Sequence, residues 1–458
     1  MVSIKTSVHP TRSGGMYNAL ALGMIFIFLL SACSTATPTS TPTSLPSTPI
    51  PGGIYVDPSQ SLGPISPYVY GINIGPWAAV PFERNQDALD LKFKFLRYPG
   101  GSWGDSNNLQ KYQIDQYVDY AGKMGAEPSI CVRVPGSTPE KAAELVRYTN
   151  IEKKYAVKYW CIGNEPTLYQ TTNVGKDYDT ARYNQVWREF AVAMRAVDPT
   201  ILIYGPEVHQ FTANPDANPK DTSGLDWMDE FLKANGDMVD IVSIHRYPFP
   251  VDRYTTITID DMRANPSEWD SIIPLLRSRI QELTGRDLPI AVTEINSHWS
   301  QAVGGDATPD SFYNAIWWGD VLARLIRQDV DIVTYFSLPT GAGGFGLFSR
   351  LAEIRPTYYT FKMYHHFGSE LVSADSGTTD VTVYAALSSD GKLTVLIINL
   401  SPEAKSLPLQ LVGDWQLSET WLFDSTHTAE QIDSPTFVNG SLVDLPAQSI
   451  TLFVFSNP

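Results

Sequence analysis

The chain has 458 residues, of which 43% are hydrophobic and 18% charged, an ordinary globular balance that leaves room for one large domain and a smaller one. The formal net charge of −16 argues against nucleic acid or an anionic membrane surface as a partner. Cysteine occurs only three times and no cysteine or histidine spacing fits a metal-ligand pattern, so neither a metal nor another cofactor is expected.

The first 33 residues indicate an export signal. Lys5 and Arg12 precede an uncharged apolar run, 19–30, that is short for a membrane span. A Leu-Ser-Ala-Cys sequence ends directly afterwards at Cys33 and resembles a bacterial lipoprotein signal. This resemblance implies a lipidated Cys33 and an extracellular, cell-surface protein held to the membrane through that lipid anchor only. An ordinary signal peptide or an N-terminal anchor helix is the alternative.

A linker follows at 34–53. It contains no charged residue, five prolines and many serines and threonines. Such a composition cannot bury a core, so an extended, semi-rigid tether is predicted.

Residues 54–371 are predicted to form a barrel. Eight short apolar runs alternate with longer amphipathic stretches, and near-continuous apolar strands are typical of a parallel sheet covered by helices. The runs lie at 68–75, 93–98, 129–134, 157–163, 201–205, 239–245, 289–293 and 330–338. This alternation predicts the α/β class and a (β/α)8 TIM barrel. A doubly wound open sheet is the rival, but it would normally bring a glycine-rich phosphate loop after its first strand, and the sequence has none there.

The intervals between the runs contain helix signals. Thr138-Pro139-Glu140 combines an N-cap, a first-turn proline and an acid at the positive end of the helix dipole. Apolar residues recur at helical spacing from Tyr183 to Val197, and Asp198-Pro199 ends that helix. The last barrel helix is predicted at 356–370.

Residues 372–458 are predicted to form a smaller all-β sandwich. Short strands at 381–386, 393–400, 407–411, 420–423 and 449–455 are separated by turn residues. Residues 54–60 are expected to pair with this sandwich as an edge strand.

Two glutamates stand at the ends of otherwise apolar runs. Glu165 follows the fourth run in Trp-Cys-Ile-Gly-Asn-Glu-Pro, and Glu294 ends the seventh in Ala-Val-Thr-Glu-Ile. The functional groups of a (β/α)8 barrel gather where its strands end, so both glutamates are expected in one site. Glycosidic bond cleavage requires such a pair, with one carboxyl group protonated and the other ionised. For a single glutamate at a strand end, a structural salt bridge would be the better explanation, but it explains two such glutamates less well.

The stretch from about 70 to 361 resembles glycoside hydrolase clan A. Enzymes of that clan carry an Asn-Glu pair at the end of strand four and a Glu at the end of strand seven, and Asn164-Glu165 and Thr293-Glu294 match these positions. The resemblance implies that Glu165 is the acid/base, that Glu294 is the nucleophile and that the anomeric configuration is retained. It also implies that Asn164 binds the 2-hydroxyl group of the sugar.

Further segments resemble particular branches of the clan. The Leu-Arg-Tyr-Pro-Gly-Gly sequence around Arg97 resembles the α-L-arabinofuranosidase and endoglucanase branch, where this arginine supports the catalytic centre and the bound substrate; a purely structural ion pair is the alternative. His245 and Tyr247 stand where the clan often has residues that contact the nucleophile and substrate. The sandwich resembles that of the β-xylosidase and β-glucuronidase families. Pro166 and the Glu-Ile-Asn context of Glu294 depart from the arabinofuranosidase pattern, so no sugar is assigned.

Side chains near the strand ends are candidate substrate contacts. An indole ring offers the flat apolar area on which a pyranose can stack, although packing in the core or at the rim is the alternative for each aromatic residue. The candidates are Trp77, Trp103, Tyr247, Trp299 and Phe336, with His209 as a further cleft or rim residue. Cys131 and Cys161 lie in apolar runs, where buried free thiols are expected and a disulfide is the alternative.

These observations predict a retaining glycoside hydrolase that acts on a poly- or oligosaccharide. A transglycosylase would use the same glutamate pair with a sugar as acceptor, and the sequence does not separate the two. A carbohydrate-binding lipoprotein without catalysis is a third alternative, against which the presence of both glutamates argues. The sugar, the linkage, exo or endo attack and the oligomeric state do not follow from the sequence.

Overall fold

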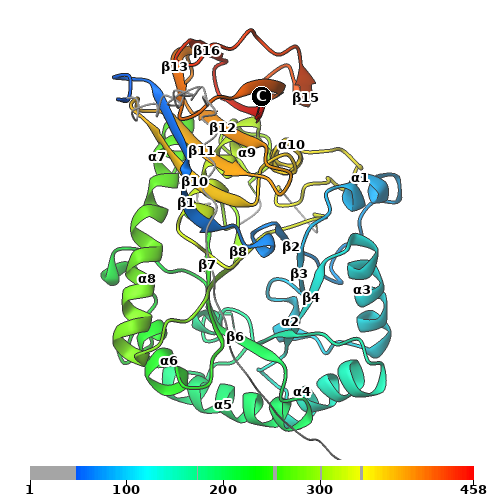
Figure 1. The fold of residues 1–458 in the computed structure, drawn as a ribbon. Coiled ribbons are helices and arrows are strands. Elements are labelled where there is room, and N and C mark those ends of the chain that lie inside the picture. Colours follow the sequence, from blue (N-terminus) through cyan, green and yellow to red (C-terminus); the bar gives the residue numbers. More distant parts are fainter. Residues whose placement is uncertain (1–47, 173, 251–254, 300–301, 341–343, 458) are drawn as a thin grey trace, which may run out of the picture. The chain divides into compact units, whose positions relative to one another are not determined.

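The computed structural model describes residues 48–457, apart from residues 173, 251–254, 300–301 and 341–343. Eight parallel strands close into a barrel in which their order follows the chain (Figure 1). They are β2 (Gly71–Asn73), β3 (Phe95–Tyr98), β4 (Glu127–Val132), β5 (Tyr159–Ile162), β6 (Leu202–Val208), β7 (Ile241–Arg246), β8 (Ile290–Ile295) and β9 (Ile332–Tyr335). β9 pairs with β2, so the sheet has no open edge. The predicted (β/α)8 barrel is confirmed, and each strand overlaps one of the eight apolar runs.

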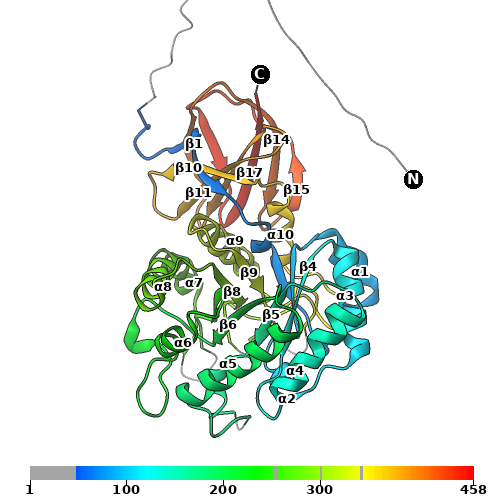
Figure 2. The ribbon, with the colours of Figure 1, turned by 60° about the horizontal axis from the view of Figure 1, so that its bottom comes forward.

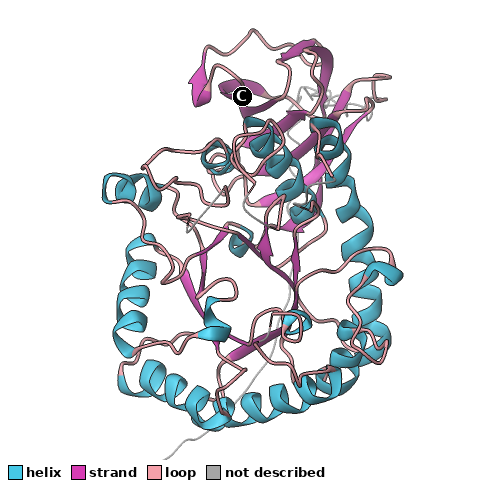
Figure 3. Cartoon of the chain, turned by 180° about the vertical axis from the view of Figure 1, so that it is seen from behind, coloured by secondary structure: helices cyan, strands magenta, loops and turns pink. Residues whose placement is uncertain are grey.

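Helices form a layer outside the barrel strands (Figure 3). The longer ones are α3 (Lys111–Met124), α4 (Pro139–Val146), α5 (Thr180–Val197), α6 (Trp227–Asn235), α8 (Trp269–Thr284), α9 (Phe312–Arg327) and α10 (Thr357–Tyr364). Short helices are α1 (Asn85–Asp90), α2 (Trp103–Ser106) and α7 (Ile259–Ala264). The helix start predicted at Thr138 is correct, because its hydroxyl group accepts the backbone N–H of Lys141 at the N-terminus of α4.

The apolar face of each long helix covers the barrel. In α5 the buried residues Tyr183, Trp187, Phe190 and Met194 recur every three to four positions, so they line one side of the helix. Burial of this stripe, rather than helix propensity, supplies most of the stability of such a helix.

The inside of the barrel is divided between an apolar floor and a polar mouth. Strand side chains alternate, so in β3 Phe95 and Arg97 point inward while Leu96 packs toward the helices. Phe95 belongs to a buried floor cluster, whose other members are Cys131, Tyr159, Cys161, Tyr204, Ile241, Ala291 and Ile332. Arg97 is the next inward-facing residue of β3 after Phe95 and therefore lies nearer the mouth.

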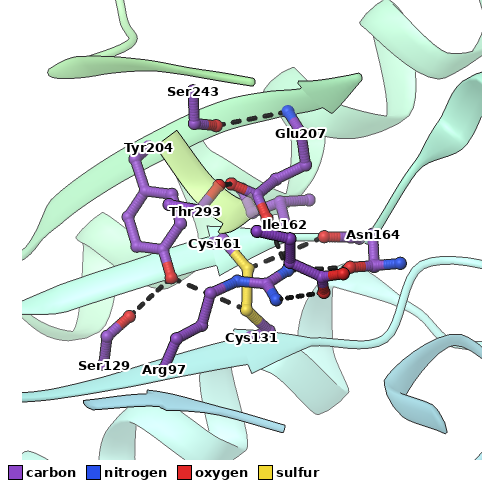
Figure 4. Close-up of a disulfide and its surroundings, with 12 residues drawn as sticks. Arg97, Ser129, Cys131, Cys161, Ile162, Asn164, Tyr204, Glu207, Ser243 and Thr293 are labelled. Carbon is purple, nitrogen blue, oxygen red and sulfur yellow. Dashed lines mark hydrogen bonds and ion pairs between the residues drawn. A yellow bond between two sulfur atoms is a disulfide. The ribbon is translucent and has the colours of Figure 1, made fainter. Parts of the chain in front are cut away.

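A disulfide joins Cys131 and Cys161 in this floor (Figure 4). The two residues are direct partners in the parallel pairing of β4 with β5, and their Cα atoms are 4.5 Å apart. Both side chains face the barrel interior, which brings their sulfur atoms together. The expectation of free thiols is therefore wrong. The two cysteines are 30 residues apart in the sequence, and the sequence alone does not tell which residues of neighbouring strands stand opposite each other.

The second domain is one nine-stranded, mostly antiparallel sheet that curls into a sandwich-like fold (Figure 2). Its order is β15 (Thr428–Ile432), β14 (Gln416–Phe423), β17 (Ser449–Ser456), β12 (Leu393–Asn399), β11 (Val381–Leu387), β10 (Glu370–Ser376), β1 (Ile54–Pro64), β13 (Lys405–Leu411) and β16 (Leu442–Leu445). β1 pairs with both β10 and β13, so residues 54–60 lie inside the sheet and not at its edge as expected. The helix predicted to extend to 370 ends at Tyr364, because Glu370 already begins β10.

The two faces of this sheet pack into two different hydrophobic cores. In β12, Leu396 and Ile398 join the cluster that contains the barrel helices, while Val395 and Ile397 fill the fold of the sheet itself. The sheet lies close to α9, since a Cβ on Gly319 of α9 would lie 2.7 Å from the Cδ1 atom of Ile450 in β17. A polar contact adds to it, because the hydroxyl groups of Thr382 and Tyr384 donate to Asp320, both at 2.7 Å.

The described end of the predicted linker lies against the sheet. The backbone N–H of Ile50 donates to the Oε1 atom of Gln410 at 3.0 Å, and the Nε2 of Gln410 donates to the carbonyl of Thr48. The signal segment with Cys33 and most of the linker lie outside the described residues. Among the residues that the structure does describe, no helix is both long and apolar enough to cross a membrane.

Candidate active site

Polar side chains from six of the eight barrel strands meet at the mouth of the barrel. Each stands at or just beyond the carboxyl end of its strand, the end at which barrel enzymes carry their active sites. They are Asn73 of β2, Arg97 of β3, Asn164 and Glu165 after β5, Glu207 of β6, His245 of β7 and Glu294 of β8. Register shifts in the pairing of β6 with β7, and of β8 with its neighbours, accompany the turn of these side chains toward the mouth.

Glu165 and Glu294 face each other around His245. The Nδ1 atom of His245 lies 2.9 Å from Oε1 of Glu165 and 3.9 Å from Oε2 of Glu294. The three side chains offer atoms that all lie within 4.8 Å of one another. The two glutamates predicted to share a site therefore stand close enough to act on the same bond.

Three donors hold Glu294. The Nη1 atom of Arg97 donates to its Oε1 at 2.6 Å, and the backbone N–H of Gly101 donates to the same oxygen. The hydroxyl group of Tyr247 donates to Oε2 at 2.8 Å. Burial and the negative charges of Glu294 and Glu165 raise the pKa of Tyr247 well above its usual value, so this hydroxyl group keeps its proton and remains a donor.

Arg97 is a fully buried cation beneath the site. Besides Glu294, its guanidinium donates to Asn73. It also donates to Asn164 and Glu207 (Figure 4). Burial works against the charge, but the carboxylates of Glu207 and Glu294 raise the pKa of Arg97, so it stays charged. With no exposed surface, Arg97 orients the acidic groups and Asn164 from below and does not line the cavity.

The side-chain amide of Asn164 has a hydrogen-bond partner at its oxygen but none at its nitrogen. Its Oδ1 atom accepts the Nη2 of Arg97 at 2.8 Å, whereas its buried Nδ2 atom has no hydrogen-bond partner in the protein. The backbone N–H of Asn164 donates to Asp105, which also accepts the hydroxyl group of Tyr169 at 2.9 Å. An unpaired buried donor is costly in a finished structure, so Nδ2 is a candidate for a bond to substrate.

Glu207 is a third carboxylate at the site, and the sequence reasoning missed it. It is fully buried, accepts from Arg97 and from Thr293, and lies 3.0 Å from the Nε2 atom of His245. Burial alone would raise the pKa of Glu207, but the positive charges of Arg97 and His245 lower it to about 2. The signal was present in Tyr-Gly-Pro-Glu-Val, an acid in an apolar run, which is the criterion that identified Glu294.

His245 carries a positive charge in this setting. Burial alone would lower the pKa of His245, but the charges of Glu294 and Glu207 and the hydrogen bonds with Glu165 and Glu207 raise it to about 10. Both ring nitrogens then donate, Nδ1 to Glu165 and Nε2 to Glu207. His245 thus links Glu165 and the buried Glu207 through its ring and lines neither of the cavities described below.

The carboxylates open into a cavity of about 500 Å³. Glu165 and Glu294 line it together with several predicted contacts, while its aromatic wall comes from β7, β8 and the segment after β9. Its lining residues are Gly101, Ser102, Glu165, Leu168, His209, Gln210, Tyr247, Glu294, Trp299, Phe336 and Phe345. His209 is fixed by Thr167 at 2.7 Å, and burial lowers its pKa, so its ring is neutral at neutral pH.

A second cavity of about 440 Å³ adjoins the first. It holds the remaining predicted aromatic candidates, Trp77 and Trp103, and shares Gly101, Ser102, Phe336 and Phe345 with the first cavity. Every aromatic candidate named from the sequence therefore lines one of the two cavities. Among them Trp299 is the most open, with 57% of its surface exposed.

Among the residues that the structure describes, two clusters have the spacing of a cation site. Glu165, His245 and Glu294 form one, but both ring nitrogens of a protonated His245 carry hydrogens and have no lone pair to offer. Cys131, Cys161 and Glu207 form the other, where the disulfide leaves no thiolate.

Comparison with known proteins agrees with this architecture. A β-xylosidase of Geobacillus stearothermophilus is 26% identical over 271 residues, which cover 54% of this chain and 48% of that protein. An intracellular exo-α-(1→5)-L-arabinofuranosidase of Halalkalibacterium halodurans is 24% identical over 196 residues, 34% of this chain and 37% of the relative. The chain thus spans about half the length, or less, of these curated relatives.

Solved structures share the fold. The α-L-arabinofuranosidase of Thermotoga maritima, in complex with arabinose, superimposes with a TM-score of 0.70 at 19% identity, covering 88% of this chain and 99% of that one. A family 44 xyloglucanase of Paenibacillus polymyxa, with xyloglucan, gives a TM-score of 0.71 at 16% identity over 88% of this chain and 99% of that one. Residues 142–396, more than half of the chain, match the family described as glycosyl hydrolases family 39. The match begins in α4 and includes Glu165, Glu207, His245 and Glu294, and on this basis the chain belongs to glycosyl hydrolases family 39, within clan A.

Proposed function

We propose that the protein is a retaining glycoside hydrolase in which Glu165 is the acid/base and Glu294 the nucleophile. The separation of the two carboxyl groups carries this proposal. Each offers an oxygen within 4.8 Å of an oxygen of the other, and this proximity supports the roughly 5–5.5 Å spacing of retaining enzymes over the roughly 6.5–9.5 Å spacing of inverting ones.

The first step breaks the glycosidic bond. Glu294 attacks the anomeric carbon, and Glu165 gives its proton to the departing oxygen, so a glycosyl ester on Glu294 and a free alcohol result. Arg97, Gly101 and Tyr247 hold the attacking carboxylate in one orientation. Asn164 Nδ2 is free to donate to the neighbouring sugar hydroxyl group, a bond that strengthens as positive charge develops on the ring.

The second step releases the sugar. Glu165, now ionised, takes a proton from water, and the water oxygen attacks the anomeric carbon and displaces Glu294. Two inversions give net retention. If a sugar hydroxyl group replaces water, the same step makes a new glycosidic bond, which is the transglycosylase alternative.

The test uses a panel of aryl glycosides with the Glu294→Ala and Glu165→Ala variants. Glu294→Ala should lose at least about 10³-fold in turnover while staying folded, and azide should restore glycosyl transfer with inversion. Glu165→Ala should keep more activity on substrates with good leaving groups. Glu144→Ala, an exposed acid on α4, is the matched control. Full activity of Glu294→Ala, or an inverted product from the unaltered enzyme, would contradict the assignment.

We also propose that the enzyme is displayed at the cell surface through a lipid on Cys33. The sequence around Cys33 supports this, and the Cys131–Cys161 disulfide fits an oxidising compartment outside the cytoplasm. Cys33→Ser should move the protein from the membrane fraction to the soluble one. Unchanged fractionation would refute the anchor and leave the catalytic proposal standing.

A further inference from the structure

The adjoining cavities form one groove that passes the catalytic pair. Gly101, Ser102, Phe336 and Phe345 line both cavities, so the two cavities meet at these four residues. The combined groove is larger than one sugar ring requires, since each part has a volume within the range of a small-molecule site.

The groove has a direction, given by the two glutamates. Glu294 bonds to the N–H of Gly101, a residue of the shared wall, so it stands next to the second cavity. Both glutamates line the first cavity and not the second, and Glu165 does so beside Leu168, His209 and Gln210, which also line only the first cavity. In a retaining glycosidase the nucleophile lies beneath the sugar that it captures, and the acid lies on the side of the leaving group. The second cavity therefore extends the glycone side, and the Leu168 end extends the leaving-group side.

The second cavity is built to hold a ring. Trp77 stacks on Phe336 with ring centroids 5.7 Å apart, which fixes the indole in the wall. Gly75 allows this arrangement, because a Cβ at that position would lie 1.6 Å from the Cζ3 atom of Trp77. Trp103 and the polar residues Ser106, Asn107 and Ser337 complete the lining. Aromatic faces beside hydroxyl and amide groups suit a sugar, which is apolar on its faces and polar at its edges.

The lining also limits the charge of that sugar. None of the described residues that line the second cavity is charged. A uronic acid or a sulfated sugar would lose water there without gaining a cationic partner, which is costly. The chemistry favours an uncharged sugar.

We propose that the enzyme cleaves inside a neutral polysaccharide chain, with at least two sugars bound on the glycone side, the second of them on Trp77 and Trp103. The proposal rests on the catalytic assignment of Glu165 and Glu294. It distinguishes this chain from an exo-acting enzyme, in which the glycone side must close after one residue.

The test follows the products of the full-length enzyme over time on neutral hexasaccharides from xylan, arabinan and β-1,4-glucan, labelled with ¹⁸O at the reducing end. The first products should be fragments of two or more sugars from each end, and the viscosity of the matching polymer should fall early. Release of only monosaccharide from the non-reducing end, from the first time point, would overturn the proposal. Oligogalacturonide should not be cleaved, and comparable cleavage of it would overturn the neutral-chain part.

Two variants test the second cavity. Trp103→Ala and Gly75→Ala should each lower kcat/KM for the hexasaccharide by about tenfold more than for an aryl monoglycoside, which cannot reach that cavity. Gly75→Ala acts without changing any cavity residue, since it only forces Trp77 to move. Phe82→Ala, an aromatic residue that is 91% exposed and lines neither cavity, is the matched control and should leave the ratio unchanged.

An unchanged ratio in both folded variants would show that the second cavity binds no sugar. Failure of the catalytic assignment looks different, because the unaltered enzyme would then cleave neither aryl glycosides nor oligosaccharides, and the inference would fall with it.

Discussion

The substitution Glu207→Gln tests whether the buried charges beneath the site are balanced as the structure indicates. Glutamine keeps the shape of the side chain and removes its charge, leaving the buried cations Arg97 and His245 with one carboxylate fewer. The pKa of Glu207 falls from the ordinary 4.5 to about 2 on folding. At about 1.4 kcal/mol per unit, the charged form contributes on the order of 3 kcal/mol to stability, close to the cost of breaking a buried ion pair.

The contribution depends on pH with a definite sign. A carboxylate whose pKa is lowered by folding stabilises the protein above its unfolded pKa, and this stabilisation disappears as pH falls toward the folded value. The difference between the native protein and Glu207→Gln should therefore be about 3 kcal/mol at pH 6–7 and shrink to about 1 kcal/mol at pH 3. For a chain of this size, 3 kcal/mol corresponds to a loss of about 4 °C in Tm.

Calorimetry and urea unfolding at pH 7, 4.5 and 3 measure this difference. Asp119→Asn is the control, because its pair with Lys123 on α3 is exposed and worth less than about 1 kcal/mol. An unchanged Tm at pH 7, or a difference that stays constant down to pH 3, would refute the reasoning. The activity gives a second readout, since without Glu207 the ring of His245 loses its proton at lower pH, and kcat/KM should begin to fall at lower pH than in the native enzyme.

Two further predictions concern the nucleophile and the disulfide. Tyr247→Phe removes the hydroxyl group that donates a charge-assisted hydrogen bond to Glu294 at 2.8 Å. The kcat should therefore fall about 10- to 100-fold with little change in Tm. An unchanged kcat would contradict the contact. Replacing Cys131 and Cys161 together by serine opens a loop of 30 residues. This should lower the free energy of unfolding by about 3–4 kcal/mol and Tm by about 4 °C. Detection of these two cysteines as free thiols in the unreduced, unfolded native protein would contradict the pairing.

The barrel could be predicted from the sequence because its strands are buried on both faces. A strand such as Ile290–Ile295 is buried at every position, so it stands out as a continuous apolar run. The strands missed in the second domain are different in kind. Glu370–Ser376, Thr428–Ile432 and Leu442–Leu445 each bury only one or two residues, and so short a pattern is hard to distinguish from a loop.

The site could be predicted only in part, for reasons of register. Glu165 and Glu294 were found because each ends a recognised run. Glu207 was missed because the predicted run ended at Gly205, whereas β6 continues through Pro206 to Val208 across a shift in register. The disulfide and the partners of His245 depend on which residues of neighbouring strands stand opposite each other, and this pairing is a property of the closed sheet.

The buried charges at the mouth explain why the site needs a third carboxylate. Arg97 and His245 carry two positive charges, and Glu207 and Glu294 carry two negative ones. The side chain of Glu165 is 17% exposed and faces the cavity above these charges. Without Glu207, the two cations would have only Glu294 as a buried partner, and the pKa of His245 would fall. A buried carboxylate that lines neither cavity thus keeps Arg97 and His245 charged beneath the two glutamates.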